Sequence, residues 1–362
     1  MFVLEEKKLL LEIHSLSEKL TKPVRFMEVC GTHTVSIFRH GIRQLLPKNV
    51  ELVSGPGCPV CVTDDVYMDK AIAYAKRPDT IIATFGDMLK VPGSESSLEQ
   101  AKTEGADIRI IYSPLDSLDI ARDNPDKKVI FLAVGFETTS PTAAALTIAA
   151  KEAGISNLYL LSAQKLVPPA LKTLIADKTV KVDGFILPGH VAVVTGLEPF
   201  RFLKEEHQIP AVVSGFEADE ILTAITFLLN MVVNNEAKLI NAYQAVVKDE
   251  GNPVARSVTE KVYEKADAAW RGMGIIPLSG LCMRDEFSSF DIEKVLPLTV
   301  KPSPKTTGCR CGDVLKGVIT PFNCPLFDKT CNPENPIGPC MVSVEGVCAA
   351  YYKYGRASFS FE

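Results

Sequence analysis

The first two thirds of the chain alternate short apolar runs with segments of helical pattern. Runs of five or six residues, rich in aliphatic and β-branched side chains, lie at 24–29, 50–54, 80–84, 108–112, 129–134, 158–162, 183–187 and 210–214. Such runs, apolar almost throughout, are typical of strands that are covered on both faces. Eight strand–helix units in series predict an α/β fold with parallel sheets and right-handed crossovers.

Eight strand–helix units can close into one barrel or form two open sheets. The polar stretch 123–128 divides the series into halves of similar length. We therefore expect two similar, Rossmann-like domains with open parallel sheets, 1–125 and 126–235, flanking a cleft. A single closed barrel is the alternative.

The pattern changes beyond about residue 220. Helical periodicity extends over 217–248 and 254–270, and from about residue 297 the chain is rich in Pro, Gly and Cys with little apolar periodicity. A segment so poor in core residues usually needs a metal or disulfides to hold it. We expect a third, mainly helical and Cys-rich domain over 236–362.

Composition narrows the possible partners. Of 362 residues, 46% are hydrophobic and 23% charged, and Lys plus Arg (39) against Asp plus Glu (44) gives a net charge of −5. No Lys/Arg block stands out, so nucleic acid is not an expected partner. The first twenty residues do not resemble a signal peptide, and no apolar run is long enough to span a membrane. We expect a cytoplasmic protein without membrane contact, in which clustered cysteines indicate metal or redox chemistry.

Reactive side chains follow several of the predicted strands. In open parallel sheets, ligands bind beyond the carboxyl ends of the strands. These positions hold Cys30, His33, Cys58, Cys61, Glu137 and His190. Some strand-end residues are ordinary turn and helix-cap residues, and His190 is as compatible with a turn position as with a ligand. The cysteines and histidines together predict a reactive cleft between the two domains.

The Cys58-Pro-Val-Cys61 motif follows a predicted strand and precedes a helix beginning near Asp64. A helix N-terminus lowers the pKa of a thiol, and this spacing lets two sulfurs close a disulfide, as in thioredoxin-like redox motifs. A zinc knuckle would need a second Cys/His pair, and none lies nearby in the sequence. With this pair, Cys30 and His33 could form a site for a thiophilic metal. The alternative is that Cys30 is a buried apolar side chain and His33 lies at a helix cap.

Residues 309–348 contain six more cysteines, with the spacing C-x-C-x12-C-x6-C-x8-C-x7-C. Four thiolates can hold a tetrahedral zinc ion or a [4Fe–4S] cluster. The staggered spacing lacks the paired knuckles of structural zinc sites, so it favours an iron–sulfur cluster over zinc. Disulfides are a third possibility, disfavoured in the cytoplasm.

Six motifs together resemble one protein family. MEVCGTHT at 27–34, SGPGCPVCVT at 54–63, TFGDMLKVPG at 84–93, VGFETTSPT at 134–142, LPGHV at 187–191 and MVSVEGVCAAYYKYG at 341–355 are similar to motifs of the HypD family of [NiFe]-hydrogenase maturation factors. The resemblance covers nearly the entire chain. It implies a scaffold that works with a small chaperone, HypC, and with a cyanide donor, HypE. On this scaffold an iron atom acquires two cyanides and one carbon monoxide, as Fe(CN)2CO, before transfer to the hydrogenase large subunit.

The resemblance also implies roles for individual residues. Cys30 is the expected holder of the iron under assembly, and Cys58 and Cys61 are the expected redox-active pair. His33, His190 and Glu137 are expected nearby, in catalytic positions. The expected ligands of a [4Fe–4S] cluster are Cys311, Cys324, Cys331 and Cys348, with Cys309 and Cys340 as alternatives, whereas Cys282 is expected to be a plain core thiol. We expect the cluster to reduce the Cys58–Cys61 disulfide during iron loading or cyanide attachment.

Two other functions stay open at this point. The CxxC pair could belong to a general thiol–disulfide oxidoreductase, which would turn over disulfide substrates without HypC. The chain could instead be a non-catalytic assembly platform stabilised by zinc, which would contain no acid-labile sulfide.

Overall fold

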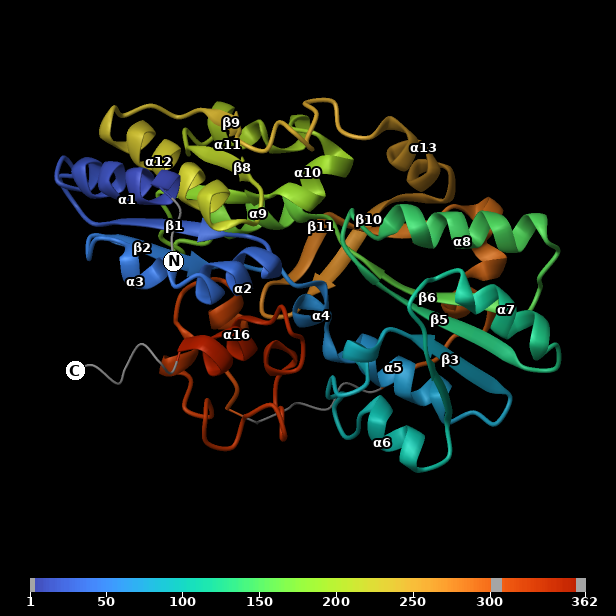
Figure 1. The fold of residues 1–362 in the computed structure, drawn as a ribbon. Coiled ribbons are helices and arrows are strands. Elements are labelled where there is room, and N and C mark those ends of the chain that lie inside the picture. Colours follow the sequence, from blue (N-terminus) through green and yellow to red (C-terminus); the bar gives the residue numbers. More distant parts are fainter. Residues whose placement is uncertain (1–3, 301–307, 356–362) are drawn as a thin grey trace.

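The computed structural model describes residues 4–300 and 308–355 and has two parallel sheets (Figure 1). The first has the strand order β2-β1-β7-β8-β9, formed by β1 (Val24–Glu28), β2 (Val50–Ser54), β7 (Gly184–Pro188), β8 (Ala211–Ser214) and β9 (Leu239–Asn241). The second has the order β4-β3-β5-β6, formed by β3 (Thr80–Thr84), β4 (Asp107–Ile110), β5 (Lys128–Gly135) and β6 (Leu158–Gln164). A separate antiparallel hairpin joins β10 (Tyr263–Trp270) to β11 (Gly274–Met283).

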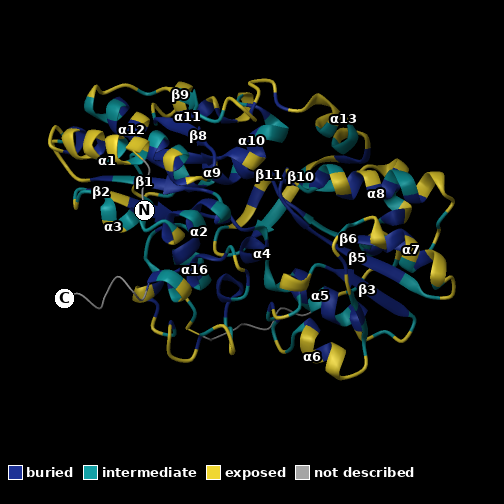
Figure 2. Cartoon of the chain, viewed as in Figure 1, coloured by how far each residue is buried: buried dark blue, intermediate teal, exposed yellow. Residues whose placement is uncertain are grey.

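Helices surround both sheets, and Figure 2 shows their outer faces exposed while the strands are mostly buried. In chain order, the α-helices are α1 (Leu4–Ser17), α2 (Gly31–Arg39), α3 (Ile42–Leu45), α4 (Pro59–Val62), α5 (Asp65–Ala75), α6 (Leu98–Thr103), α7 (Asp116–Asp123), α8 (Ser140–Glu152), α9 (Val167–Ala176), α10 (Gly189–Thr195), α11 (Phe202–Glu205), α12 (Ala218–Val233), α13 (Pro253–Val262), α14 (Ile292–Val295), α15 (Cys311–Leu315) and α16 (Val347–Tyr354).

The eight predicted strands are confirmed to within two residues, and so is the α/β class with parallel sheets. Every residue of β3 is buried, as is β5 from Val129 to Gly135, because helices cover both faces of the sheet. The alternative of one closed barrel is wrong, since the strands form two separate open sheets.

The two sheets are interleaved along the chain, contrary to the expected halves 1–125 and 126–235. β5 pairs with β3 across the polar stretch 123–128, with Ile81 opposite Val129, and β7 returns to pair with β1. The apolar pattern of a strand shows that it is buried but not which strand it pairs with. Because 123–128 is only the end of α7 and the turn into β5, it does not separate the two sheets.

Each sheet has its own apolar layer. α1 and α12 pack together over the first sheet, where Phe26 and Ile186 meet Leu228. α8 and α13 pack together over the second sheet, where Phe131 lies in the same core as Leu146. Burying one such side chain contributes about 1.5–3 kcal/mol. A third core extends from the first sheet into the Cys-rich region, which therefore packs on the α/β body.

Two predicted long helices are shorter than expected. The helix predicted over 217–248 is α12, which ends at Val233, and Asn235 then has a left-handed φ of 53°. The helix predicted over 254–270 is α13, which ends at Val262 and runs directly into β10. β10 is buried at its two ends and largely exposed between them, which suits a hairpin strand. The region beyond residue 236 is therefore less helical than predicted.

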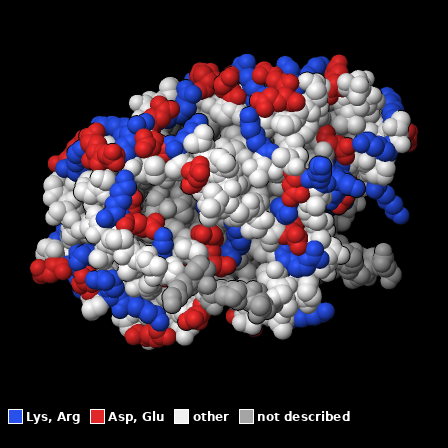
Figure 3. Space-filling model, turned by 180° about the vertical axis from the view of Figure 1, so that it is seen from behind, with Lys and Arg blue, Asp and Glu red and all other residues white. Residues whose placement is uncertain are grey.

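The surface carries mixed charge. On the face seen from behind in Figure 3, acidic and basic side chains are interspersed and do not form one basic field. Within 4–300 and 308–355, none of the helices is both long and apolar enough to cross a membrane.

Candidate functional site

The CxxC motif lies where β2 leads into the short helix α4. Cys58 precedes the helix in extended conformation, and its sulfur accepts a hydrogen bond from the Cys61 N–H at 3.4 Å. Pro59 suits the first helical position, because the N–H that it lacks would be unpaired there. The two sulfurs lie 2.8 Å apart, and neither side chain is more than 3% exposed. The structure thus holds two thiols face to face at the start of a helix.

Burial changes the acidity expected of this pair. The N-terminus of a helix lowers a thiol pKa, but α4 has only four residues and Cys61 is fully buried. Burial raises the pKa of Cys61 well above its usual value. The prediction of a lowered thiol pKa is therefore wrong for Cys61, which is a protonated thiol at neutral pH.

C-terminal cysteines contact the CxxC pair directly. The Cys61 sulfur lies 3.9 Å from the Pro339 carbonyl oxygen and also interacts with the Cys340 thiol. The Cys340 sulfur in turn lies 2.7 Å from that of Cys311. Two thiol pairs, Cys58/Cys61 and Cys311/Cys340, therefore lie side by side, and we call these four residues the four-thiol cluster.

Three more cysteines lie around the four-thiol cluster. Cys309 interacts with the Cys311 thiol, and Cys348 interacts with the Cys340 thiol. Cys331 is within electrostatic range of both Cys309 and Cys348. The Cys-rich region thus concentrates its thiols on the side that faces α4.

Three of the four predicted cluster ligands lie near one another, because Cys311 and Cys331 are both within electrostatic range of Cys348. Cys311 is paired with Cys340, and Cys324 is buried at the start of the loop that returns at Cys331. No hydrogen bond joins Cys324 to another thiol in the part of the chain that the structure describes. Within the same residues, no group of three or more Cys, His, Asp or Glu side chains is already arranged to hold a metal ion.

The tip of the β10–β11 hairpin connects the two thiol pairs. Arg271 donates its backbone N–H to the Val62 carbonyl at 2.8 Å and its Nε–H to the Thr63 carbonyl at 2.9 Å, at the end of α4. Its guanidinium pairs with Asp65 at 2.7 Å and lies within electrostatic range of Cys311. A buried positive charge therefore lies next to the four-thiol cluster.

Cys30 lies on the loop next to the CxxC motif. The Gly31 N–H donates to the Gly57 carbonyl at 3.0 Å. Gly57 must lack a side chain, because a Cβ there would overlap the backbone of Cys30. Burial raises the pKa of the Cys30 thiol to about 11, and the Glu345 carboxylate adds to the rise. The three N-terminal cysteines thus lie together at the carboxyl ends of β1 and β2.

Acidic side chains accompany Cys30. Thr32 donates a hydrogen bond to Glu345 at 2.8 Å. Burial raises the pKa of Asp87, and the negative charge of Glu345 adds to that rise. Burial lowers the pKa of His190, and the charge of Glu345 opposes that lowering. Cys30, Asp87, His190 and Glu345 therefore share one electrostatic environment. Glu345 was not among the predicted site residues, and its only sequence signal is its place in the MVSVEGVC motif.

The two predicted histidines are stacked on the same aromatic ring. Phe216 stacks on His33 at 4.5 Å and on His190 at 4.0 Å between ring centroids. His33 is fully buried, makes a 2.8 Å hydrogen bond to the Gly215 carbonyl, and burial lowers its pKa to about 4. His33 is therefore a neutral, structurally engaged side chain, whereas the exposed His190 is available to a ligand.

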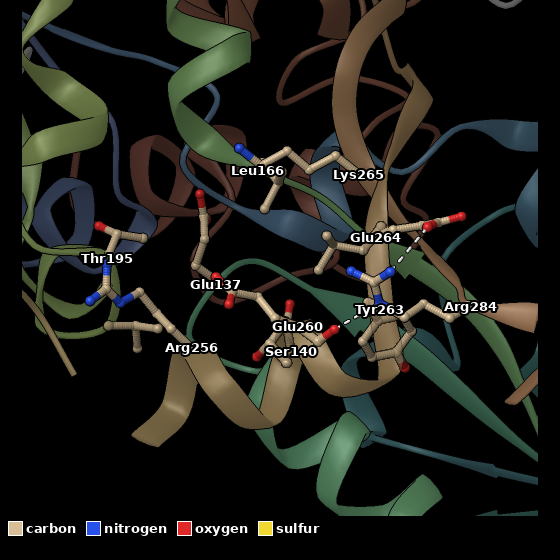
Figure 4. Close-up of a pocket in the computed structure, with 13 residues that line it drawn as sticks. Glu137, Ser140, Leu166, Thr195, Arg256, Glu260, Tyr263, Glu264, Lys265 and Arg284 are labelled. Carbon is tan, nitrogen blue, oxygen red and sulfur yellow. Dashed lines mark hydrogen bonds and ion pairs between the residues drawn. The ribbon is translucent and has the colours of Figure 1, made fainter. Parts of the chain in front are cut away.

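Two other residues of interest are not members of the four-thiol cluster. Glu137 lines a cavity between α8, α10, α13 and β10, and its Oε1 accepts the Val167 N–H at 2.9 Å (Figure 4). Cys282 lies on β11 and is only partly buried, so it is not a core residue as expected.

The fold and the site define the chain as a two-sheet α/β protein with a thiol-based site at the carboxyl ends of its first strands. The HypD family model, described as the hydrogenase formation hypA family, matches residues 5–355. The chain belongs to this family.

Named relatives match over nearly the same length. The hydrogenase maturation factor HypD of Rhodobacter capsulatus is 43% identical over 361 residues, covering 97% of this chain and 96% of the relative. HypD of Escherichia coli strain K12 is 42% identical over 343 residues, covering 94% and 91%. HypD of Cupriavidus necator is 42% identical over 339 residues, covering 91% and 89%.

Proposed function

We propose that this chain acts in hydrogenase maturation, as a scaffold on which an iron atom receives two cyanides and one carbon monoxide. Its partners would be a HypC-type chaperone and a HypE-type cyanide donor, and the product would pass to the hydrogenase large subunit. The names of the relatives support the maturation role. The observation that carries the chemistry is the contact of Cys61 with Cys340, which joins the CxxC motif to the C-terminal cysteines.

Cys30 would hold the iron that is being assembled. It is the most accessible of the three N-terminal cysteines, and Asp87, His190 and Glu345 lie in its electrostatic environment. Its thiol has a pKa of about 11, so iron binding must displace a proton. The carboxylates beside it can compensate the positive charge of the ion, and a thiolate suits a soft metal.

The four-thiol cluster would store and pass on reducing equivalents. The Cys61 sulfur would attack Cys340 of a Cys311–Cys340 disulfide while its proton passes to the leaving Cys311. Cys58 would then displace Cys340 from the mixed disulfide and pass its proton to Cys340, which closes the CxxC disulfide and leaves two thiols on the second pair. This exchange moves two electrons and two protons between the pairs and requires no other reactant. The reverse exchange returns the CxxC pair to the dithiol state next to Cys30.

A resident [4Fe–4S] cluster would be held by four of the C-terminal thiols. If Cys311 and Cys340 act as a redox pair, the cysteines left to hold it are Cys309, Cys324, Cys331 and Cys348. We therefore propose Cys309 in place of Cys311 as a ligand, because Cys331 is within electrostatic range of Cys309 and Cys348. When bound, such a cluster supplies electrons one at a time.

The buried position of the CxxC pair argues against a general thiol–disulfide oxidoreductase. Such an enzyme must bring a substrate disulfide into contact with its attacking sulfur. Here Cys58 is 3% exposed and Cys61 is fully buried. A scaffold that exchanges electrons with its own cysteines does not need that access.

The proposal is tested by producing the chain with HypC- and HypE-type partners and recording the infrared bands of cyanide and carbon monoxide on the isolated complex. We expect Cys30→Ala and Cys61→Ala to lose these bands. Cys282→Ala, which removes a thiol on β11, should retain them. Bands that persist in Cys30→Ala would contradict the iron-holding role, and bands that persist in Cys61→Ala would contradict the redox role.

A further inference from the structure

A cavity of about 280 Å³, with no cysteine in its lining, lies between three helices and the β10–β11 hairpin. Its walls come from the start of α8, the end of α10, α13, β10 and β11 (Figure 4). Carbon atoms form most of the inner surface, and Leu166, Val194 and Leu281 contribute to it. A cavity of this kind is suited to a small molecule with an apolar body.

Glu137 is the buried carboxylate of this cavity, whose lining also includes the buried Ser140 and Tyr263. Glu137 is 7% exposed, and its Oε1 accepts the backbone N–H of Val167 at the first position of α9. Its Oε2 is buried and has no hydrogen-bond partner among the described residues. The bond to the N-terminus of α9 gives one carboxylate oxygen a partner but leaves the other oxygen without one. A buried carboxylate oxygen without a partner is costly, so the missing partner must be a donor.

The rim of the cavity carries exposed charges of both signs. They are Arg256 and Glu260 on α13, Glu264 and Lys265 on β10, and Arg284 after β11. Arg284 is held by the Glu260 carbonyl at 2.8 Å and by the Glu264 carboxylate at 3.4 Å, as Figure 4 shows. The ring of Tyr263 also lines the cavity, and its buried hydroxyl, like the Oε2 of Glu137, has no hydrogen-bond partner among the described residues. Of the carboxylates that line the cavity, Glu137 is the buried one, so it is the group that can select a positively charged donor.

We propose that this cavity binds a small molecule that has an apolar body and donates an N–H to the free Oε2 of Glu137. The donor is an amine, amidine or amide nitrogen. A positively charged donor binds more tightly than a neutral one, because it also compensates the buried negative charge of Glu137. No cysteine lines this cavity, and the proposal does not rest on the proposed role in hydrogenase maturation.

An isosteric series of three probes tests the proposal on the full chain by isothermal titration calorimetry. Benzamidine, benzamide and benzoate share one shape but offer a cationic donor, a neutral donor and no donor. We expect benzamidine to bind most tightly, benzamide less tightly, and benzoate about tenfold more weakly than benzamidine or worse.

Matched variants identify the group that recognises the donor. Glu137→Gln keeps the shape and the acceptor for Val167 but removes the charge, and should weaken benzamidine about tenfold. Glu260→Gln removes the same charge at the exposed rim and should change the affinity by about twofold at most. Val194→Phe fills the cavity from α10 without altering Glu137, and should abolish binding of all three probes even if Glu137→Gln does not fold.

Proton release gives a second readout. Burial raises the pKa of Glu137 to about 7, and the charge of Lys265 only partly opposes this rise. Near pH 7 the carboxyl is therefore partly protonated, and a bound benzamidinium ion must displace that proton. The binding heat should then vary with the ionisation enthalpy of the buffer, and this variation should disappear in Glu137→Gln. Three results would overturn the proposal: benzoate binding as tightly as benzamidine, unchanged benzamidine affinity in Glu137→Gln, or no saturable binding of any probe.

Discussion

Glu28 shows how a single buried charge supports the site. It lies at the end of β1, two residues before Cys30, and its side chain is fully buried. Arg43 donates to its carboxylate at 2.9 Å, and the same oxygen accepts hydrogen bonds from Ser54 and Thr34. Burial raises the pKa of Glu28, and Arg43 opposes that rise. The folded protein therefore depends on Arg43 to hold Glu28 in its ionised form.

Replacing Arg43 should destabilise the protein in a pH-dependent way. Arg43→Met leaves a buried carboxyl without its cation, which costs about 3 kcal/mol of unfolding free energy at pH 7. Because the folded-state pKa of Glu28 is raised, its protonated form is favoured at low pH, and stability is lost as the pH rises through that pKa. Urea denaturation should therefore show that Arg43→Met lowers the free energy of unfolding less at pH 5 than at pH 8.

A double variant provides the control for this prediction. Glu28→Gln combined with Arg43→Met removes both charges and should recover most of the lost stability. If Arg43→Met lost the same unfolding free energy at both pH values, or if the double variant were no more stable than Arg43→Met, the assigned role of the Glu28–Arg43 pair would be contradicted.

Individual residues differ in how far the sequence predicts them. Cys58 and Cys61 were predictable as a pair, because both ends of a CxxC motif lie within one helical turn. The contact between Cys61 and Cys340 was not, because spacing along an irregular segment does not determine which thiols meet in space. The burial of His33 and its bond to Gly215 were not predictable either, and its Nδ1 has no hydrogen-bond partner among the described residues, so its catalytic role stays a prediction.

At the scale of elements, the β10–β11 hairpin fixes the relative position of the two thiol pairs. Arg271 binds the carbonyls at the end of α4, and Gly272 lies against Gly312 in α15. A Cβ at Gly272 would overlap the Cα of Gly312, and the φ of Gly272 is +76°. The hairpin tip therefore touches the helices that carry Cys61 and Cys311.

Two glycines of this hairpin form a matched pair for mutation. Gly274 has the same φ of +76°, but nothing lies within 4 Å of a Cβ placed there. Gly274→Ala should lower the free energy of unfolding by about 1 kcal/mol, from backbone strain alone. Gly272→Ala should lower it by about 1–3 kcal/mol more, because the new methyl group must also displace α15. Guanidinium denaturation of the two variants measures the difference, and equal losses of unfolding free energy would show that the hairpin does not pack tightly against α15.

The elements themselves were largely predictable, but their partners were not. Continuous apolar runs such as 80–84 and 129–134 identify buried strands, because only strands covered on both faces lack polar residues. Their pairing across 123–128 depends on contacts that no local pattern records. The segment 254–270 was predicted as a helix throughout, because its charged and apolar residues fit a helical repeat. In the structure its second half is a strand, whose two ends, Tyr263 and Trp270, are packed in apolar cores.

At the scale of the whole molecule, the Cys-rich region is built onto the α/β body. Its buried cysteines belong to the same apolar core as Met27 and Val53 of the first sheet. In Figure 1 the region lies beside α2 and α4, and α16 packs against α2. The two groups of cysteines, far apart in the sequence, therefore form one continuous site that includes the four-thiol cluster.

The most direct test of this account is to trap the contact between the two thiol pairs. In the triple variant Cys58→Ser/Cys311→Ser/Cys348→Ser, Cys61 and Cys340 lose their other thiol neighbours but keep each other. After mild anaerobic oxidation with diamide, peptide mapping by mass spectrometry should find a disulfide between Cys61 and Cys340. The control variant Cys58→Ser/Cys340→Ser/Cys348→Ser should form the corresponding Cys61–Cys311 bond much less readily. A folded triple variant in which Cys61 and Cys340 stay unlinked would contradict the four-thiol cluster and the electron exchange proposed for it.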